Sequence, residues 1–109
     1  MSNLTCANVI QPSDLRLKSE VRYADTQYSY DAIRQIPLKT FSWNNSEIDT
    51  IGWIAQDVEI NLPLAVTEHD LYGFSNCKML NIYQIISHMF GAIQKLQEKV
   101  EQLQKEKAE

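Results

Sequence analysis

The residues best suited to chemistry lie in one short run, from Ser13 to Lys18, which reads Ser-Asp-Leu-Arg-Leu-Lys. A serine hydroxyl becomes a useful nucleophile when a base takes its proton, and a lysine amine is such a base where desolvation or a neighbouring cation lowers its pKa. The alternative is that Ser13 and Asp14 form an ordinary helix N-cap, with Arg16 and Lys18 as surface residues. From this run alone, the capping interpretation carries more weight.

The spacing of Ser13 and Lys18 restricts how they can meet. Residues five positions apart lie about 140° apart around a helix at about 100° per residue, and they lie on opposite faces of a strand. We therefore expect the pair to meet across a turn, or between chains, where the lysine of one chain serves the serine of another. The second arrangement would make the chemistry depend on assembly.

Composition argues against several classes of function. The chain has 109 residues and a net charge of −4, without the basic stripe that nucleic-acid binding needs. It also lacks an apolar run near the roughly 20 residues of a membrane span. We expect neither a nucleic-acid nor a membrane partner.

Further reactive side chains are isolated from one another. Cys6 and Cys77 lie far apart, as do His69 and His88, so we expect reduced thiols, no metal site and no cofactor. A hydrolase that acts on outside substrates ranks last, because no Gly-rich loop or Ser/His/Asp set is visible.

Short elements should occupy the middle of the chain. Asp25 or Thr26 can cap a helix that ends at Pro37. Period-two runs flanked by turn formers predict two β-hairpins. Their strands are expected at 38–43, 48–55, 65–68 and 77–80, with turns at 44–46, 72–73 and 75–76.

The C-terminal segment gives the strongest local signal. Asn81 is a plausible N-cap, with Gln84 placed as in a capping box. Beyond it, apolar residues step by threes and fours in the a and d positions of heptads. These seam residues are Ile86, Met89, Ile93, Leu96, Val100 and Leu103. A helix from Asn81 to Lys107 would run about 40 Å, which is too long to pack back on a domain of this size, so we expect self-association.

The heptads leave the number of chains open. β-branched residues at a with Leu at d favour two parallel strands, whereas Met89 and the short seam are compatible with three. A dimeric coiled-coil adaptor that binds another protein through its β unit is therefore one alternative. Gly91, within the helix, should cost it about 1 kcal/mol relative to alanine.

In their order along the chain, these segments resemble the intramolecular chaperone auto-processing domain. That domain lies at the C-terminus of phage endosialidases, tail spikes and tail fibres, and within myelin regulatory factors. The matching pieces are S-D-x-R-x-K from Ser13, Ile36-Pro37, Phe41-x-Trp43, Ile51-Gly52-Trp53-Ile54-Ala55-Gln56-Asp57-Val58, Leu62-Pro63 and Ala92-Ile93-Gln94-Lys95-Leu96. No single piece is specific, but the combination is.

The resemblance implies an α+β fold, in which a small β-hairpin-rich unit with short helices precedes a long C-terminal helix of a homotrimeric coiled coil. Residues 1–12 would be the remnant of a parent stalk or a linker arm, 13–80 the chaperone unit and 81–109 the coiled-coil helix. Members of the family trimerise, align three chains of a fibrous parent and then release themselves. The parent would be a tail fibre or tail spike, assembled in the host cytoplasm and carried in the virion tail.

The resemblance also implies roles for single residues. Ser13 would be the nucleophile, Lys18 the general base and Pro12–Ser13 the scissile bond, with Asp14 and Arg16 in support. A capping or orienting role suits the short acceptor side chain of Asp14. The activity would be that of a self-cleaving serine endopeptidase that acts once and needs no cofactor. A trimeric assembly module of the same fold that does not cleave is the second alternative.

Overall fold

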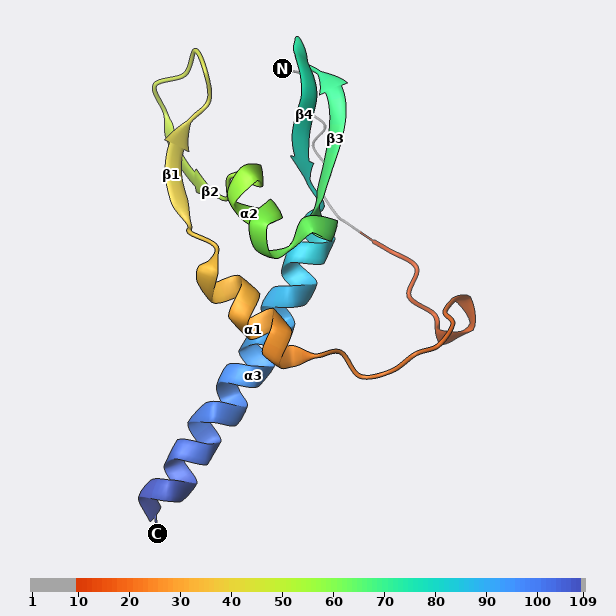
Figure 1. Cartoon of the computed structure of the whole chain (residues 1–109), viewed down its shortest axis with the longest axis vertical. Coiled ribbons are helices and arrows are strands. Elements are labelled where there is room, and N and C mark those ends of the chain that lie inside the picture. The colour runs from red at the N-terminus through yellow and green to blue at the C-terminus, as the bar shows by residue number, and fades with distance from the viewer. Residues whose placement is uncertain (1–9, 109) are drawn as a thin grey trace.

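The computed structural model describes residues 10–108 and shows an α+β domain (Figure 1). Two separate antiparallel hairpins, short helices and a long C-terminal helix are present, as the sequence predicts. The elements are η1 (Leu15–Leu17), α1 (Thr26–Gln35), β1 (Lys39–Ser42), β2 (Asp49–Gly52), α2 (Ala55–Asn61), η2 (Pro63–Ala65), β3 (Val66–Leu71), β4 (Phe74–Leu80) and α3 (Ile82–Ala108).

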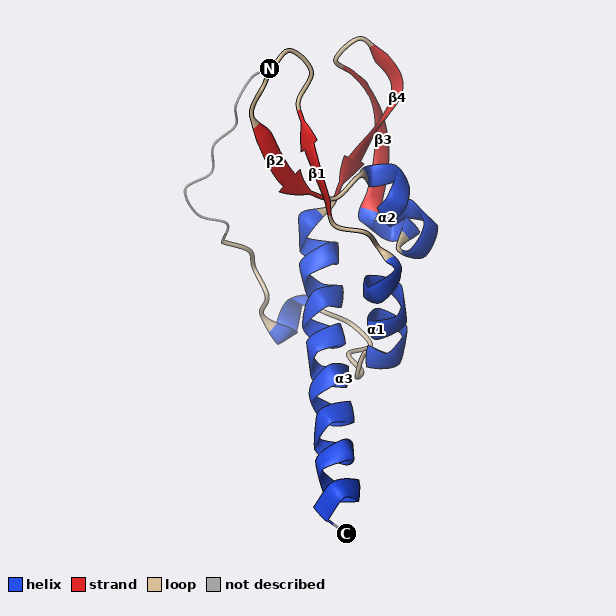
Figure 2. Cartoon of the chain, turned by 90° about the vertical axis from the view of Figure 1, so that its left-hand side faces the viewer, coloured by secondary structure: helices blue, strands red, loops and turns tan. Residues whose placement is uncertain are grey.

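Helix α1 is bounded by the expected cap and stop. Asp25 Oδ1 accepts the N–H of Tyr28 at 3.1 Å, so Asp25 rather than Thr26 is the N-cap. The helix ends before Pro37, which cannot continue its hydrogen bonding. It lies along the first half of α3, and both hairpins sit beyond it at one end of the domain (Figure 2).

The first hairpin pairs β1 with β2 and places Phe41 opposite Thr50. The prediction that its second strand runs to residue 55 was wrong, because β2 ends at Gly52 and α2 begins at Ala55. An acidic residue in the first turn stabilises a helix, and Asp57 occupies that position. Its carboxylate also lies 2.9 Å from Lys39 Nζ, so it connects α2 to β1.

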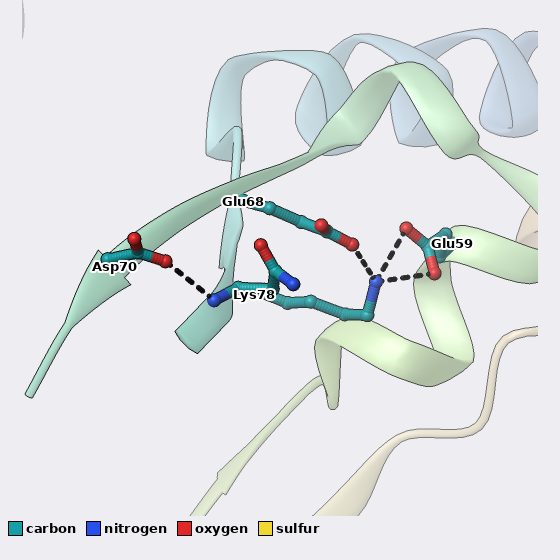
Figure 3. Close-up of polar contacts among 5 residues, drawn as sticks. Glu59, Glu68, Asp70 and Lys78 are labelled. Atoms are coloured by element: carbon teal, nitrogen blue, oxygen red, sulfur yellow. Dashed lines mark hydrogen bonds and ion pairs between the residues drawn. The ribbon is translucent and has the colours of Figure 1, made fainter. Parts of the chain in front are cut away.

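The second hairpin turns once, at Tyr72 and Gly73, which both have positive φ. The second turn predicted at 75–76 was wrong, because these residues lie within β4. Asn76 instead takes a left-handed φ of 55° at a bulge in the strand pairing. Its N–H donates to Asp70 Oδ1 at 3.0 Å (Figure 3).

Lys78 of β4 connects the second hairpin to α2. Its Nζ lies 2.9 Å from Glu59 Oε1 of α2 and 2.5 Å from Glu68 Oε1 of β3 (Figure 3). The Lys78 side chain is 20% exposed, whereas those of Glu59 and Glu68 are 39% and 44% exposed, so water still reaches the two carboxylates. The hydrogen bond to Glu68, and then that to Glu59, raise the pKa of Lys78 above its ordinary value.

A raised pKa makes the stability contributed by Lys78 depend on pH. The contribution is complete below the ordinary lysine pKa of about 10.4 and is lost as the pH rises through the higher folded-state value. Lys78→Met should therefore lower the urea midpoint at pH 8, and its difference from the wild type should shrink as the pH passes about 11. Lys105→Met, in the last turn of α3, is the matched control. An equal effect of Lys78→Met at both pH values would contradict the prediction.

The core lies where α1, α2, η2 and the start of α3 meet. Its buried side chains are Ala32, Val58, Leu62, Ala65 and Ile85. Asn81 Oδ1 accepts the N–H of Gln84 at 3.2 Å, which confirms Asn81 as the cap of α3. The last turns of α3 project past α1 (Figures 1 and 2). None of the helices described here has the length and apolar content to span a bilayer.

Gly91 lies where α3 packs closely against Ser29 of α1. A β-carbon added there would lie 3.0 Å from Ser29 Oγ and 3.1 Å from Ser29 Cβ. Ser29 is 4% exposed, and its hydroxyl is hydrogen-bonded to His88 Nδ1 at 2.8 Å. The serine therefore cannot turn aside without losing this bond. Gly91 weakens α3 locally, but the close packing of α1 against α3 requires a residue without a side chain at this position.

Gly91→Ala should destabilise the domain even though alanine is the better helix former. Overpacking costs typically 1–3 kcal/mol and the gain in helix propensity is about 1 kcal/mol, so we expect a net loss of about 1 kcal/mol. Chemical denaturation measures it. In a Ser29→Gly background the same change should be neutral or stabilising, because the clash is gone. A stabilising effect in the wild-type background would contradict this interpretation of the crossing.

Candidate functional site

The run that holds Ser13 and Lys18 lies outside the body of the domain. Every residue from 10 to 25 is exposed, and the segment loops away from α1 and α3 (Figure 1). Its large apolar side chains include Leu15, Leu17 and Val21, which are 64–71% exposed. The site is therefore built from local contacts within the segment.

Asp14 begins the short turn η1. Its backbone is extended, and its Oδ1 accepts the N–H of Arg16 at 2.8 Å. The turn closes when Leu17 N–H donates to Asp14 O at 3.0 Å and Lys18 N–H donates to Leu15 O at 3.1 Å. Asp14 thus caps the turn that reverses the chain between Ser13 and Lys18.

Arg16 holds the same carboxylate by two further bonds. Its Nε donates to Asp14 Oδ1 at 3.0 Å and its Nη2 donates to Asp14 Oδ2 at 2.9 Å. The side-chain bonds from Arg16, followed by the backbone bond, hold the pKa of Asp14 below its ordinary value. The two charges neutralise each other, so the guanidinium is engaged by Asp14 rather than acting as a free cation.

Ser13 and Lys18 meet across this turn. Lys18 Nζ donates to Ser13 Oγ at 2.7 Å within one chain. Of the two arrangements that the spacing allows, this is the one within a chain. The distance suits transfer of a proton from a serine hydroxyl to an amine. Both side chains are exposed.

The other reactive side chains lie elsewhere. Cys77 is half-buried in β4 opposite His69, while Cys6 lies outside the described residues. Across residues 10–108, no three His, Cys, Asp or Glu side chains come together as metal ligands. His88 is hydrogen-bonded to the buried Ser29 between α1 and α3. No local pattern indicates this contact, since its partners are 59 positions apart.

The second feature of the site is the outer face of α3. Five of the predicted seam residues are between 45% and 63% exposed in the single chain. They are Ile86, Ile93, Leu96, Val100 and Leu103. Met89 differs, because it is partly buried and packs against the core. The buried residues of the helix are Ile85, Gly91 and Ala92. At about 100° per residue, Ile85 and Ala92 lie beside the seam rather than opposite it, so the buried side of α3 borders an apolar stripe that is in solvent.

The comparison with protein families decides the identity. The chain matches the family described as chaperone of endosialidase over residues 13–67, about half of its length. The chain belongs to the chaperone of endosialidase family. This confirms the resemblance noted from the sequence and gives the domain a chaperone role. A search of curated proteins found no match.

The chaperone of endosialidase family is classed among the peptidases. The match begins at Ser13, includes Lys18 and continues through α1, the first hairpin, α2 and η2 into β3. It ends before β4 and α3. The matched segment therefore contains the Ser13–Lys18 contact, while the exposed seam of α3 lies beyond it.

Proposed function

We propose that this chaperone domain forms a homotrimer, aligns three copies of a parent protein joined ahead of Ser13, and releases itself by cutting the Pro12–Ser13 bond. In this proposal the parent is a phage tail fibre or tail spike, and assembly takes place in the host cytoplasm. The observation that carries the cleavage is the 2.7 Å contact between Lys18 Nζ and Ser13 Oγ. The start of the family match at Ser13 supports the same boundary.

The cleavage chemistry follows from the position of the nucleophile, because Ser13 lies directly after the Pro12–Ser13 bond that is cut. Ser13 Oγ passes its proton to the neutral amine of Lys18 and attacks the carbonyl carbon of Pro12. The C–N bond between Pro12 and Ser13 breaks, and the leaving nitrogen takes the proton from Lys18. Water then hydrolyses the resulting ester, which frees the Pro12 carboxylate and the Ser13 hydroxyl. Each chain reacts once, because its substrate is its own backbone.

Assembly supplies what the single chain lacks. A lysine works as a base where water is excluded from it, and both side chains are exposed in one chain. Three chains that join through the outer face of α3 would bring their N-terminal segments and the parent together. The exposed Leu15 and Leu17, on either side of Arg16, provide apolar surface that such packing can cover. Cleavage would then follow assembly.

The need for a trimeric chaperone follows from the folding of fibres. Interchain β pairing is non-local and slow to nucleate, and a wrong register turns the wrong faces inward. A domain that associates early raises the effective concentration of the three parent chains. Once it is removed, the product is kinetically trapped, because the piece that would permit reversible reassembly is gone.

The test is a fusion of a folded reporter ahead of residue 1. Sedimentation equilibrium should give the mass of three chains, and mass spectrometry should find a fragment that begins at Ser13. A three-chain particle of intact mass would replace the proposal with a non-cleaving assembly module. A two-chain particle would favour the dimeric adaptor, which the a and d residues of the seam also allow.

A further inference from the structure

The distance between Ser13 and Lys18 must be set by the segment that carries them. All residues from 10 to 25 are exposed, so packing against the domain body does not fix either side chain. A turn of three residues with 3₁₀ geometry is weak by itself. What strengthens it here is the set of bonds between Asp14 and Arg16.

We propose that Asp14 and Arg16 are positioning residues for the cleavage reaction. Their two-point ion pair closes η1, and it leaves Lys18 Nζ free to form its hydrogen bond with Ser13 Oγ. This inference rests on the proposed function. The geometry behind it is the cap at 2.8 Å together with the side-chain bonds at 3.0 and 2.9 Å. A guanidinium and a carboxylate joined at two points fix each other's orientation as well as their distance.

Arg16 has a second effect, which concerns competition for Lys18. The Asp14 carboxylate is the acidic group immediately beside Ser13 in the sequence, and an ammonium group prefers a carboxylate to a hydroxyl. Arg16 occupies both oxygens of that carboxylate. Lys18 therefore bonds Ser13 rather than Asp14. Without Arg16, Asp14 would draw the lysine away from the nucleophile.

The competition for Lys18 provides a test that distinguishes a positioning role of Arg16 from a role in the stability of the turn alone. In Arg16→Gln, the free carboxylate should capture Lys18, and the rate of reporter release should fall about 100-fold, as expected for a displaced reacting group. In Asp14→Asn/Arg16→Gln, the asparagine still caps the turn but no carboxylate remains. The double variant should recover at least about tenfold of the lost rate. If Asp14 and Arg16 only stabilised the fold, the losses in release rate from the two substitutions would add, and the double variant would be slower than Arg16→Gln.

The experiment measures release of the reporter from the fusion over time, with the particle mass checked for each variant. Arg22→Gln is the matched control, because Arg22 lies in the same exposed segment and bonds the carbonyl of Glu20 instead. A double variant as slow as Arg16→Gln, or an Arg16→Gln variant as fast as the wild type, overturns the positioning role alone. A wild-type fusion that stays intact overturns the cleavage, and the positioning role with it.

Discussion

Ser13→Ala should abolish release of a fused reporter and leave the proposed trimer intact. The substitution removes the attacking oxygen, and loss of a serine nucleophile costs at least about 10³-fold in rate. The fold should be unaffected, because Ser13 lies in the exposed segment before α1. Mass spectrometry of the fusion and sedimentation of the particle measure the two expectations separately. Ser19→Ala, in the same segment, is the control that should cut normally.

Lys18→Arg tests the base more sharply than Lys18→Ala. Arginine keeps the positive charge and can still donate to Ser13 Oγ, but its guanidinium cannot give up a proton in a protein. We expect no release from either variant. If Lys18→Arg were cut at the wild-type rate, the lysine would be only a hydrogen-bond donor, and the base would have to be another group.

Mixing the two defective chains tests whether the reaction stays within one chain. A trimer that contains both Ser13→Ala and Lys18→Ala chains has an intact serine on one chain and an intact lysine on another. The 2.7 Å contact lies within one chain, so we expect mixed trimers to remain uncut. Release from the mixture would show instead that a lysine serves the serine of a neighbour.

Ile93→Glu should convert the proposed trimer into single chains. Ile93 is 55% exposed at an a position of α3, so its burial in a trimer would contribute about 1–2 kcal/mol per chain. Three carboxylates in one layer of the seam would also repel one another. The monomer should stay folded, because Ile93 is exposed in the single chain, whereas the buried residues of α3 are Ile85, Gly91 and Ala92. Sedimentation equilibrium and circular dichroism measure these two outcomes.

The neighbouring residue provides a matched control for Ile93→Glu. Gln94→Glu adds the same charge one position along the helix, outside the a and d seam, and should leave the trimer intact. Cleavage should also fail in Ile93→Glu, because the N-terminal segments stay in water. A trimer that survives Ile93→Glu would place the interface elsewhere on the domain.

Features that depend on neighbouring residues could be predicted from the sequence. Asp25 and Asn81 cap their helices because each is an acceptor placed just before a helical run. The spacing of Ser13 and Lys18 excluded regular elements, and the turn between them is the outcome. The Arg16 side chain bonds Asp14, two positions before it, and this short-range pair could also have been inferred from the sequence.

Features that depend on distant residues could not be predicted. The contact of Ser29 with His88 and the need for glycine at position 91 arise where α1 crosses α3, and no local pattern encodes that crossing. The pairing of Glu68 with Lys78 depends on the bulge at Asn76, because a regular two-residue turn at Tyr72 and Gly73 would place Glu68 opposite Cys77.

The division of α3 along its length has a consequence for how such a domain can evolve. Its first turns belong to the core of the single chain, whereas its last turns project past α1 with an apolar stripe in solvent. In the proposed trimer, substitutions near the C-terminus can therefore lengthen or shorten the lifetime of the assembly without disturbing the fold of each chain. Natural selection can therefore adjust the lifetime of the assembly and the folding stability of each chain as two nearly independent traits.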